Sequence, residues 1–148
     1  MGIFKLNKYW GLSIAVIIAI SNGIIDHFFA PTGVYLLPVI IISSTSLINL
    51  NKEKFNILIQ PIFTFILISL SDIGIKLYGG GVHDSEGQGF LIVFLFVGLL
   101  PGFIVLVLSA FLRKDVPVAA KFASVFLFLL LIYLYLQFLG NLGIGRSY

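Results

Sequence analysis

Cysteine is absent from this sequence, and charged residues are scarce, at 10% of its 148 residues. The first absence excludes disulfides, thiolate metal sites and cysteine catalysis. The second excludes an ordinary soluble domain, in which about 25% of the residues are charged. The chain is instead 59% hydrophobic, with a mean hydropathy of +1.13. This composition predicts an integral membrane protein.

The basic balance of the chain, with a pI of about 9.3, does not indicate a nucleic-acid partner. The basic residues stand singly or in pairs at the ends of apolar runs, and this pattern is typical of membrane topology signals. The sequence also has no P-loop, H-E-x-x-H pair, EF-hand loop or nucleophile elbow. It therefore predicts none of the chemistries that depend on those motifs.

Five apolar runs of the chain are long enough to cross a bilayer, whose hydrocarbon core of about 30 Å requires roughly 20 helical residues. They cover about 10–29, 32–50, 55–77, 90–112 and 118–140. The links between them are short, except for a glycine-rich segment at 78–89. We therefore predict one all-α transmembrane domain over 1–148. It is a bundle of five helices with a longer loop between the third and the fourth.

The distribution of Lys and Arg predicts the orientation of this bundle, because cytoplasmic loops carry an excess of both. An N-terminus inside the cell places seven basic residues on the cytoplasmic side and two on the outer side. The inner set is Lys5, Lys8, Lys52, Lys54, Arg113, Lys114 and Lys121, and the outer set is Lys76 and Arg146. We predict the N-terminus inside, the C-terminus outside, an uncleaved first span and location in the bacterial inner membrane.

Small residues recur at intervals of four in the first span, where Gly11, Ala15, Ala19 and Gly23 form a stripe. The fourth span contains a shorter motif, Gly98 and Gly102. Helices in lipid pack most closely where small residues face a neighbouring helix. We therefore predict helix contacts at these positions. His27 is the next residue on the first stripe, so its side chain is expected to point into the bundle.

Polar residues gather at the predicted outer face. At a rise of about 1.5 Å per residue, Asp26 lies roughly 24 Å beyond Trp10, and Asp72 lies roughly 26 Å beyond Phe55. Both carboxylates are therefore expected near the outer edge of the hydrocarbon core. The candidate cluster consists of Asp26, His27, Asp72, Lys76, His83, Asp84 and Glu86.

Two interpretations of this cluster stay open. Imidazoles and carboxylates suit a divalent cation, with His27, His83 and Asp84 as ligands, or a general acid/base pair. Alternatively, the cluster is structural, since Asp72 and Lys76 are one helical turn apart and can pair with each other. No cofactor is predicted apart from this possible cation. In the structural interpretation, the outer loop covers the bundle, and His27 lies within hydrogen-bond or single-water reach of Asp72 or of a residue from 79 to 89.

Three classes of function remain. We expect a small membrane subunit, working as a homo-oligomer or beside other membrane subunits, because the chain is short and the fifth run is apolar on every side. A membrane enzyme acting on lipid headgroups or lipid-linked substrates at the outer face is the first alternative. A channel or carrier formed by oligomerisation is the second, and it is less favoured because no charged residue lies near the middle of a span.

Overall fold

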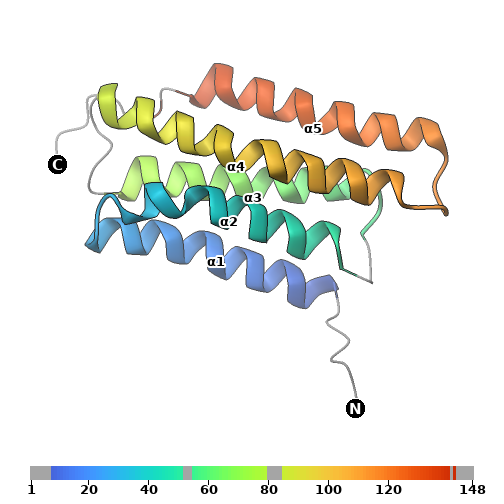
Figure 1. Ribbon diagram of the computed structural model, residues 1–148, viewed down its shortest axis with the longest axis horizontal. Helices are drawn as coiled ribbons and strands as arrows, with labels where there is room; N and C mark the ends of the chain where they lie inside the picture. Colours follow the sequence, from blue (N-terminus) through green and yellow to red (C-terminus); the bar gives the residue numbers. More distant parts are fainter. Residues whose placement is uncertain (1–7, 52–54, 80–84, 141, 143–148) are drawn as a thin grey trace, which may run out of the picture.

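The computed structural model describes residues 8–51, 55–79, 85–140 and 142. Over these residues the chain forms five α-helices, all long and apolar enough to cross a membrane. They are α1 (Lys8–Phe28), α2 (Thr32–Asn49), α3 (Ile59–Tyr78), α4 (Ser85–Phe111) and α5 (Val118–Leu139). The prediction of an all-α bundle with five helices able to span a membrane is therefore confirmed (Figure 1). The orientation stays a prediction.

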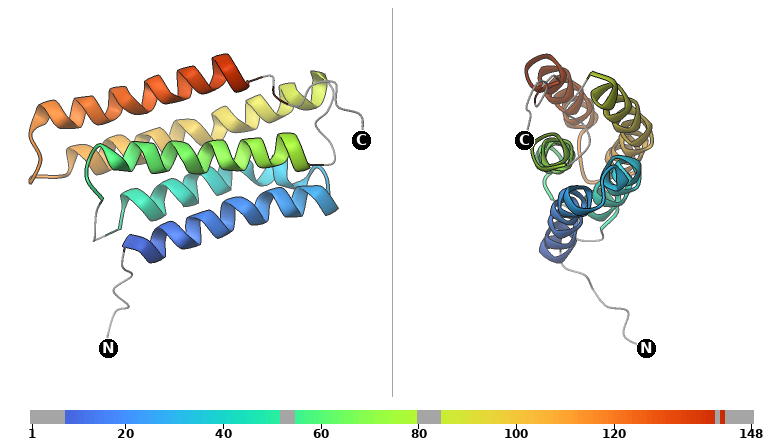
Figure 2. Two further views of the ribbon diagram at one scale, coloured as in Figure 1. Left: turned by 180° about the vertical axis from the view of Figure 1, so that it is seen from behind. Right: turned by 90° about the vertical axis from the view of Figure 1, so that its left-hand side faces the viewer.

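The five helices lie roughly parallel to one another, and successive helices run in opposite directions (Figures 1 and 2). Helix α3 contacts each of the other four helices, and α2 contacts α1, α3 and α4. Within the described residues α1 contacts only α2 and α3, and α5 contacts only α3 and α4. We call the end of the bundle at which α1, α3 and α5 finish the outer end, after the predicted orientation.

Two helix starts differ from the sequence prediction. Helix α3 begins at Ile59 rather than at 55, because the segment before it forms a turn in which the Asn56 side chain accepts a hydrogen bond from the Leu58 amide, at 3.0 Å. Pro61 then falls in the first turn, where a missing N–H removes no helical hydrogen bond. Helix α4 begins at Ser85 rather than at 90. Glu86 is therefore part of a helix, although the sequence had placed it in the loop.

The core consists of aliphatic side chains from α2, α3 and α4, completed by Phe128 from α5. A second, smaller cluster joins α1 to α2 and α3 and contains Ala15 and Ala19. Neither cluster includes a charged residue. The charged side chains that the bundle buries must therefore be accommodated elsewhere.

Glycines occupy several close contacts between helices. A Cβ atom on Gly11 would lie 2.9 Å from the Leu47 carbonyl oxygen of α2. A Cβ on Gly23 would lie 3.6 Å from the Cα of Gly74, so α1 and α3 meet glycine to glycine. Helix α4 approaches α2 at the other glycine pair. A Cβ on Gly98 would lie 2.8 Å from the Pro38 Cα, and one on Gly102 would lie 3.3 Å from the Thr45 hydroxyl oxygen.

Candidate functional site

Asp26 caps the start of α2. Its Oδ1 accepts hydrogen bonds from the backbone amides of Gly33, at 2.8 Å, and Val34, at 3.3 Å. One turn earlier on α1, the Asn22 side chain donates to the Gly33 carbonyl oxygen, at 3.1 Å. The first amides of a helix have no partners within the helix, and the positive end of its dipole favours a carboxylate. Asp26 therefore joins α1 to α2, and both it and Asn22 are fully buried.

We expect an Asp26→Ala variant to lose stability, because the Gly33 amide at the start of α2 loses its acceptor inside the bundle. Loss of a helix cap lowers the free energy of unfolding by about 0.5–2 kcal/mol. Unfolding in a detergent titration, followed by circular dichroism, measures the change. Asp115→Ala is the matched control, because the Asp115 side chain is 68% exposed and pairs with Arg113 at the surface. Equal stability of the two variants would contradict the capping role.

Asp72 and Lys76 form a buried ion pair between α3 and α5. The Lys76 ammonium lies 2.7 Å from Asp72 Oδ2, and both side chains are fully buried. The Tyr135 hydroxyl of α5 donates to the same carboxylate oxygen. Lys76 also donates to the carbonyl oxygens of Leu139, at 3.4 Å, and Gly140, at 3.0 Å. A cation is favoured at this place, because the last carbonyls of a helix lack partners and carry its negative dipole end.

His27 lies apart from this pair. Its Nδ1 is 2.8 Å from the Tyr78 carbonyl oxygen at the end of α3, and its ring packs edge-on against Phe28. A carbonyl only accepts, so Nδ1 carries the proton and donates it. The His27 side chain is exposed, and the expectation that it points into the bundle is wrong. Each interval of four residues turns the stripe by about 40° around the helix. By His27 the accumulated rotation has carried the side chain out of the packed face.

The structure thus divides the candidate cluster rather than gathering it. Asp26 serves the α1–α2 junction, Asp72 and Lys76 serve the α3–α5 contact, and Glu86 is exposed in the first turn of α4. His83 and Asp84 lie outside the described residues. Within the described part of the chain, no group of three or more His, Cys, Asp or Glu side chains is placed to hold a metal ion.

Further buried polar contacts were not predicted from the sequence. At the inner end of the bundle, Asn49 donates to the Thr45 carbonyl oxygen, at 2.9 Å, and to the Thr64 hydroxyl, at 3.0 Å. The Ser109 hydroxyl of α4 donates to the Asn49 carbonyl oxygen, at 2.5 Å. At the outer end, Gln88 donates to the Leu142 carbonyl oxygen, at 2.9 Å. Polar side chains near the ends of spans predict such hydrogen bonds only weakly, because the partners depend on which helices become neighbours.

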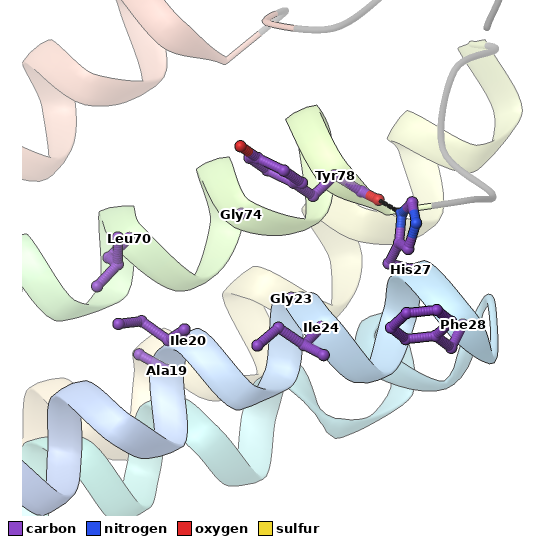
Figure 3. A pocket seen from close by; sticks show the side chains of 9 residues that line it. All are labelled: Ala19, Ile20, Gly23, Ile24, His27, Phe28, Leu70, Gly74 and Tyr78. Atoms are coloured by element: carbon purple, nitrogen blue, oxygen red, sulfur yellow. Dashed lines mark hydrogen bonds between the residues drawn. The ribbon is translucent and has the colours of Figure 1, made fainter.

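A groove of about 410 Å³ lies between the outer halves of α1 and α3 (Figure 3). Its lining is apolar except at one end, where His27 and the Tyr78 backbone meet. The residues that line it are Ala19, Ile20, Gly23, Ile24, His27, Phe28, Leu70, Gly74 and Tyr78. Of these residues, Ala19, Gly23 and His27 stand out in the sequence, but no pattern in the sequence predicts a groove.

No protein-family model matches the chain, and neither characterised proteins nor solved structures show significant similarity to it.

Proposed function

We propose that this small polytopic membrane protein works as a non-catalytic membrane subunit, as a homo-oligomer or beside other membrane subunits. The observation that carries the proposal is that the buried charged side chains at the outer end are bound to helix ends or to one another. Asp26 binds the start of α2, and Asp72 and Lys76 bind each other and the end of α5. Charged groups engaged in this way hold helices together and are not free to act on a substrate.

The shortness of the described links supports the same proposal. Only Phe29, Ala30 and Pro31 separate α1 from α2, and residues 112–117 separate α4 from α5. The faces of the helices therefore form most of the surface that the described residues offer to a partner. Association with another membrane protein would then take place within the bilayer, where close packing and interhelical hydrogen bonds drive helices together.

The two alternatives have different support. A role in binding or modifying lipids at the outer face is favoured by the groove between α1 and α3, which ends at His27. A channel or carrier has less support, because a charge inside a membrane protein that serves transport usually faces a water-filled path. The described buried charges instead contact helix ends and a tyrosine hydroxyl.

Native mass spectrometry from lipid nanodiscs tests the proposed function. We expect a mass greater than that of one chain, from further copies or from a co-purifying membrane protein. The lack of cysteine allows single cysteines to map the contact. Suitable exposed positions on four helices are Ile17, Ile66, Val97 and Phe126. Crosslinking at one of these faces, and not at all four alike, supports a specific subunit contact. A single chain at every protein-to-lipid ratio, with no co-purifying protein, contradicts it.

A further inference from the structure

The groove between α1 and α3 exists because both helices present glycine where they meet. Gly23 and Gly74 face each other, and Ala19 continues the same floor one turn further into the membrane. Ile24 on α1 and Leu70 on α3 form part of its walls (Figure 3). Both wall side chains are exposed, so the groove is accessible from the surrounding bilayer. Its volume of about 410 Å³ falls within the range of roughly 300–1,000 Å³ that is usual for small-ligand sites.

The depth of the groove matches one leaflet of the bilayer. Its α1 side extends from Ala19 to Phe28, which is about 14 Å at the helical rise. Its α3 side extends from Leu70 to Tyr78, which is about 12 Å. The whole hydrocarbon core is about 30 Å thick. A partner helix that crosses the membrane would contact the protein over the whole thickness of this core. The acyl chain of a lipid extends through only one leaflet.

The polar end of the groove lies at the level of the lipid headgroups. His27 and Phe28 are in the last turn of α1, and Tyr78 is the last residue of α3. Tyrosine is enriched at this depth, because its ring is apolar and its hydroxyl is polar. The bond from Nδ1 to the Tyr78 carbonyl holds the imidazole at the end of the groove. The other ring nitrogen, Nε2, has no hydrogen-bond partner among the described residues.

From this arrangement we infer that the groove binds one acyl chain of a phospholipid from the leaflet next to the ends of α1 and α3. The chain lies on the floor of Ala19, Gly23 and Gly74, and the headgroup phosphate meets His27. Tyr78 accepts the proton on Nδ1, so a direct hydrogen bond to a phosphate oxygen requires a second proton on Nε2, and the phosphate binds that form of the ring. The site does not depend on the oligomeric state of the protein.

Photolabelling tests the acyl-chain part of this inference. The probe is a phospholipid with a diazirine in its acyl chain, added to nanodiscs of phosphatidylethanolamine and phosphatidylglycerol that contain the full-length protein. Peptide mapping should show labelling concentrated on 19–28 and 70–78, above the level on the exposed face of α4. Labelling spread evenly over all lipid-facing helices overturns the inference. Crosslinking of this groove to a second protein chain in place of lipid also overturns it.

A glycine substitution gives the matched comparison. A Cβ on Gly74 has its nearest neighbour, the Gly23 Cα, at 3.9 Å, so Gly74→Leu introduces its side chain into the groove without a clash at the first atom. We expect groove labelling to fall at least about fivefold, the change for a loss of ~1 kcal/mol in binding. Gly89→Leu on α4 is the control, since a Cβ there meets nothing within 4 Å. Equal labelling of the two variants contradicts the site.

A second pair of variants protects the test against misfolding of Gly74→Leu. Ile24→Trp fills the groove from its wall, and Ile17→Trp places the same side chain two turns away on an exposed part of α1.

The headgroup part of the inference is tested with a diacylglycerol that carries the same diazirine but no phosphate. His27→Leu should remove the preference for the phosphate-bearing probe while leaving chain labelling in place. Retention of that preference refutes the role of His27.

Discussion

A Lys76→Met variant should be far less stable than the wild-type protein, because it leaves the Asp72 carboxylate buried without its cation. Both side chains are fully buried, and the ammonium lies 2.7 Å from the carboxylate. Breaking a buried pair by removing one partner, or placing a charge in hydrocarbon, costs on the order of 3 kcal/mol. The variant also loses the donor to the Leu139 and Gly140 carbonyls, so the outer end of α5 should detach from α3 first.

Detergent-induced unfolding followed by circular dichroism measures this loss, with Lys114→Met as the control. Lys114 is exposed between α4 and α5, so its removal should change stability by less than about 0.5 kcal/mol. A further variant, Asp72→Asn with Lys76→Met, separates charge burial from packing. It keeps an acceptor for Tyr135 and removes both charges, so it should be more stable than Lys76→Met alone. If Lys76→Met were as stable as Lys114→Met, the ion pair would have no structural role.

The sequence was sufficient to predict the five membrane helices, because the bilayer sets the length of an apolar run and each run meets that length. It was less informative about where the helices begin. Glycines at 87 and 89 disfavour a helix, and they suggested a loop up to 89. The structure nevertheless begins α4 at Ser85, and Glu86 then lies in the first turn, where a carboxylate is favourable.

Within the candidate site, the local contact was predictable and the contacts between helices were not. Asp72 and Lys76 are four residues apart on one helix, so their pairing required only helical geometry. Their other partners are Tyr135 in α5 and Gly140, the residue directly after α5, and no pattern in the sequence identifies α5 as the neighbour of α3. His27 was placed wrongly because a stripe at intervals of four was treated as straight. An α-helix has 3.6 residues per turn.

The close contact between α2 and α4 at Gly98 predicts a large effect of a substitution there. A Cβ at this position would lie 2.8 Å from the Pro38 Cα and 3.0 Å from the Ile41 Cδ1. The first neighbour is backbone, so it cannot turn aside as a flexible side chain would. A leucine at this position would have to push α4 away from α2. The two helices share the buried Leu37, Ile41, Leu95 and Leu99 of the main core, so these contacts would loosen together.

We expect Gly98→Leu to lower the free energy of unfolding by about 3 kcal/mol, at the upper end of the cost of overpacking. Gly98→Ala should have a smaller effect, because replacing glycine within a helix recovers up to ~1 kcal/mol of helix propensity. Gly89→Leu is the matched control on the same helix, where a Cβ meets nothing within 4 Å. It should be neutral or slightly stabilising in the same detergent titration. Similar losses at both positions would mean that glycine acts through the flexibility of α4. A loss at Gly98 alone identifies the contact with Pro38 as the reason that glycine is required.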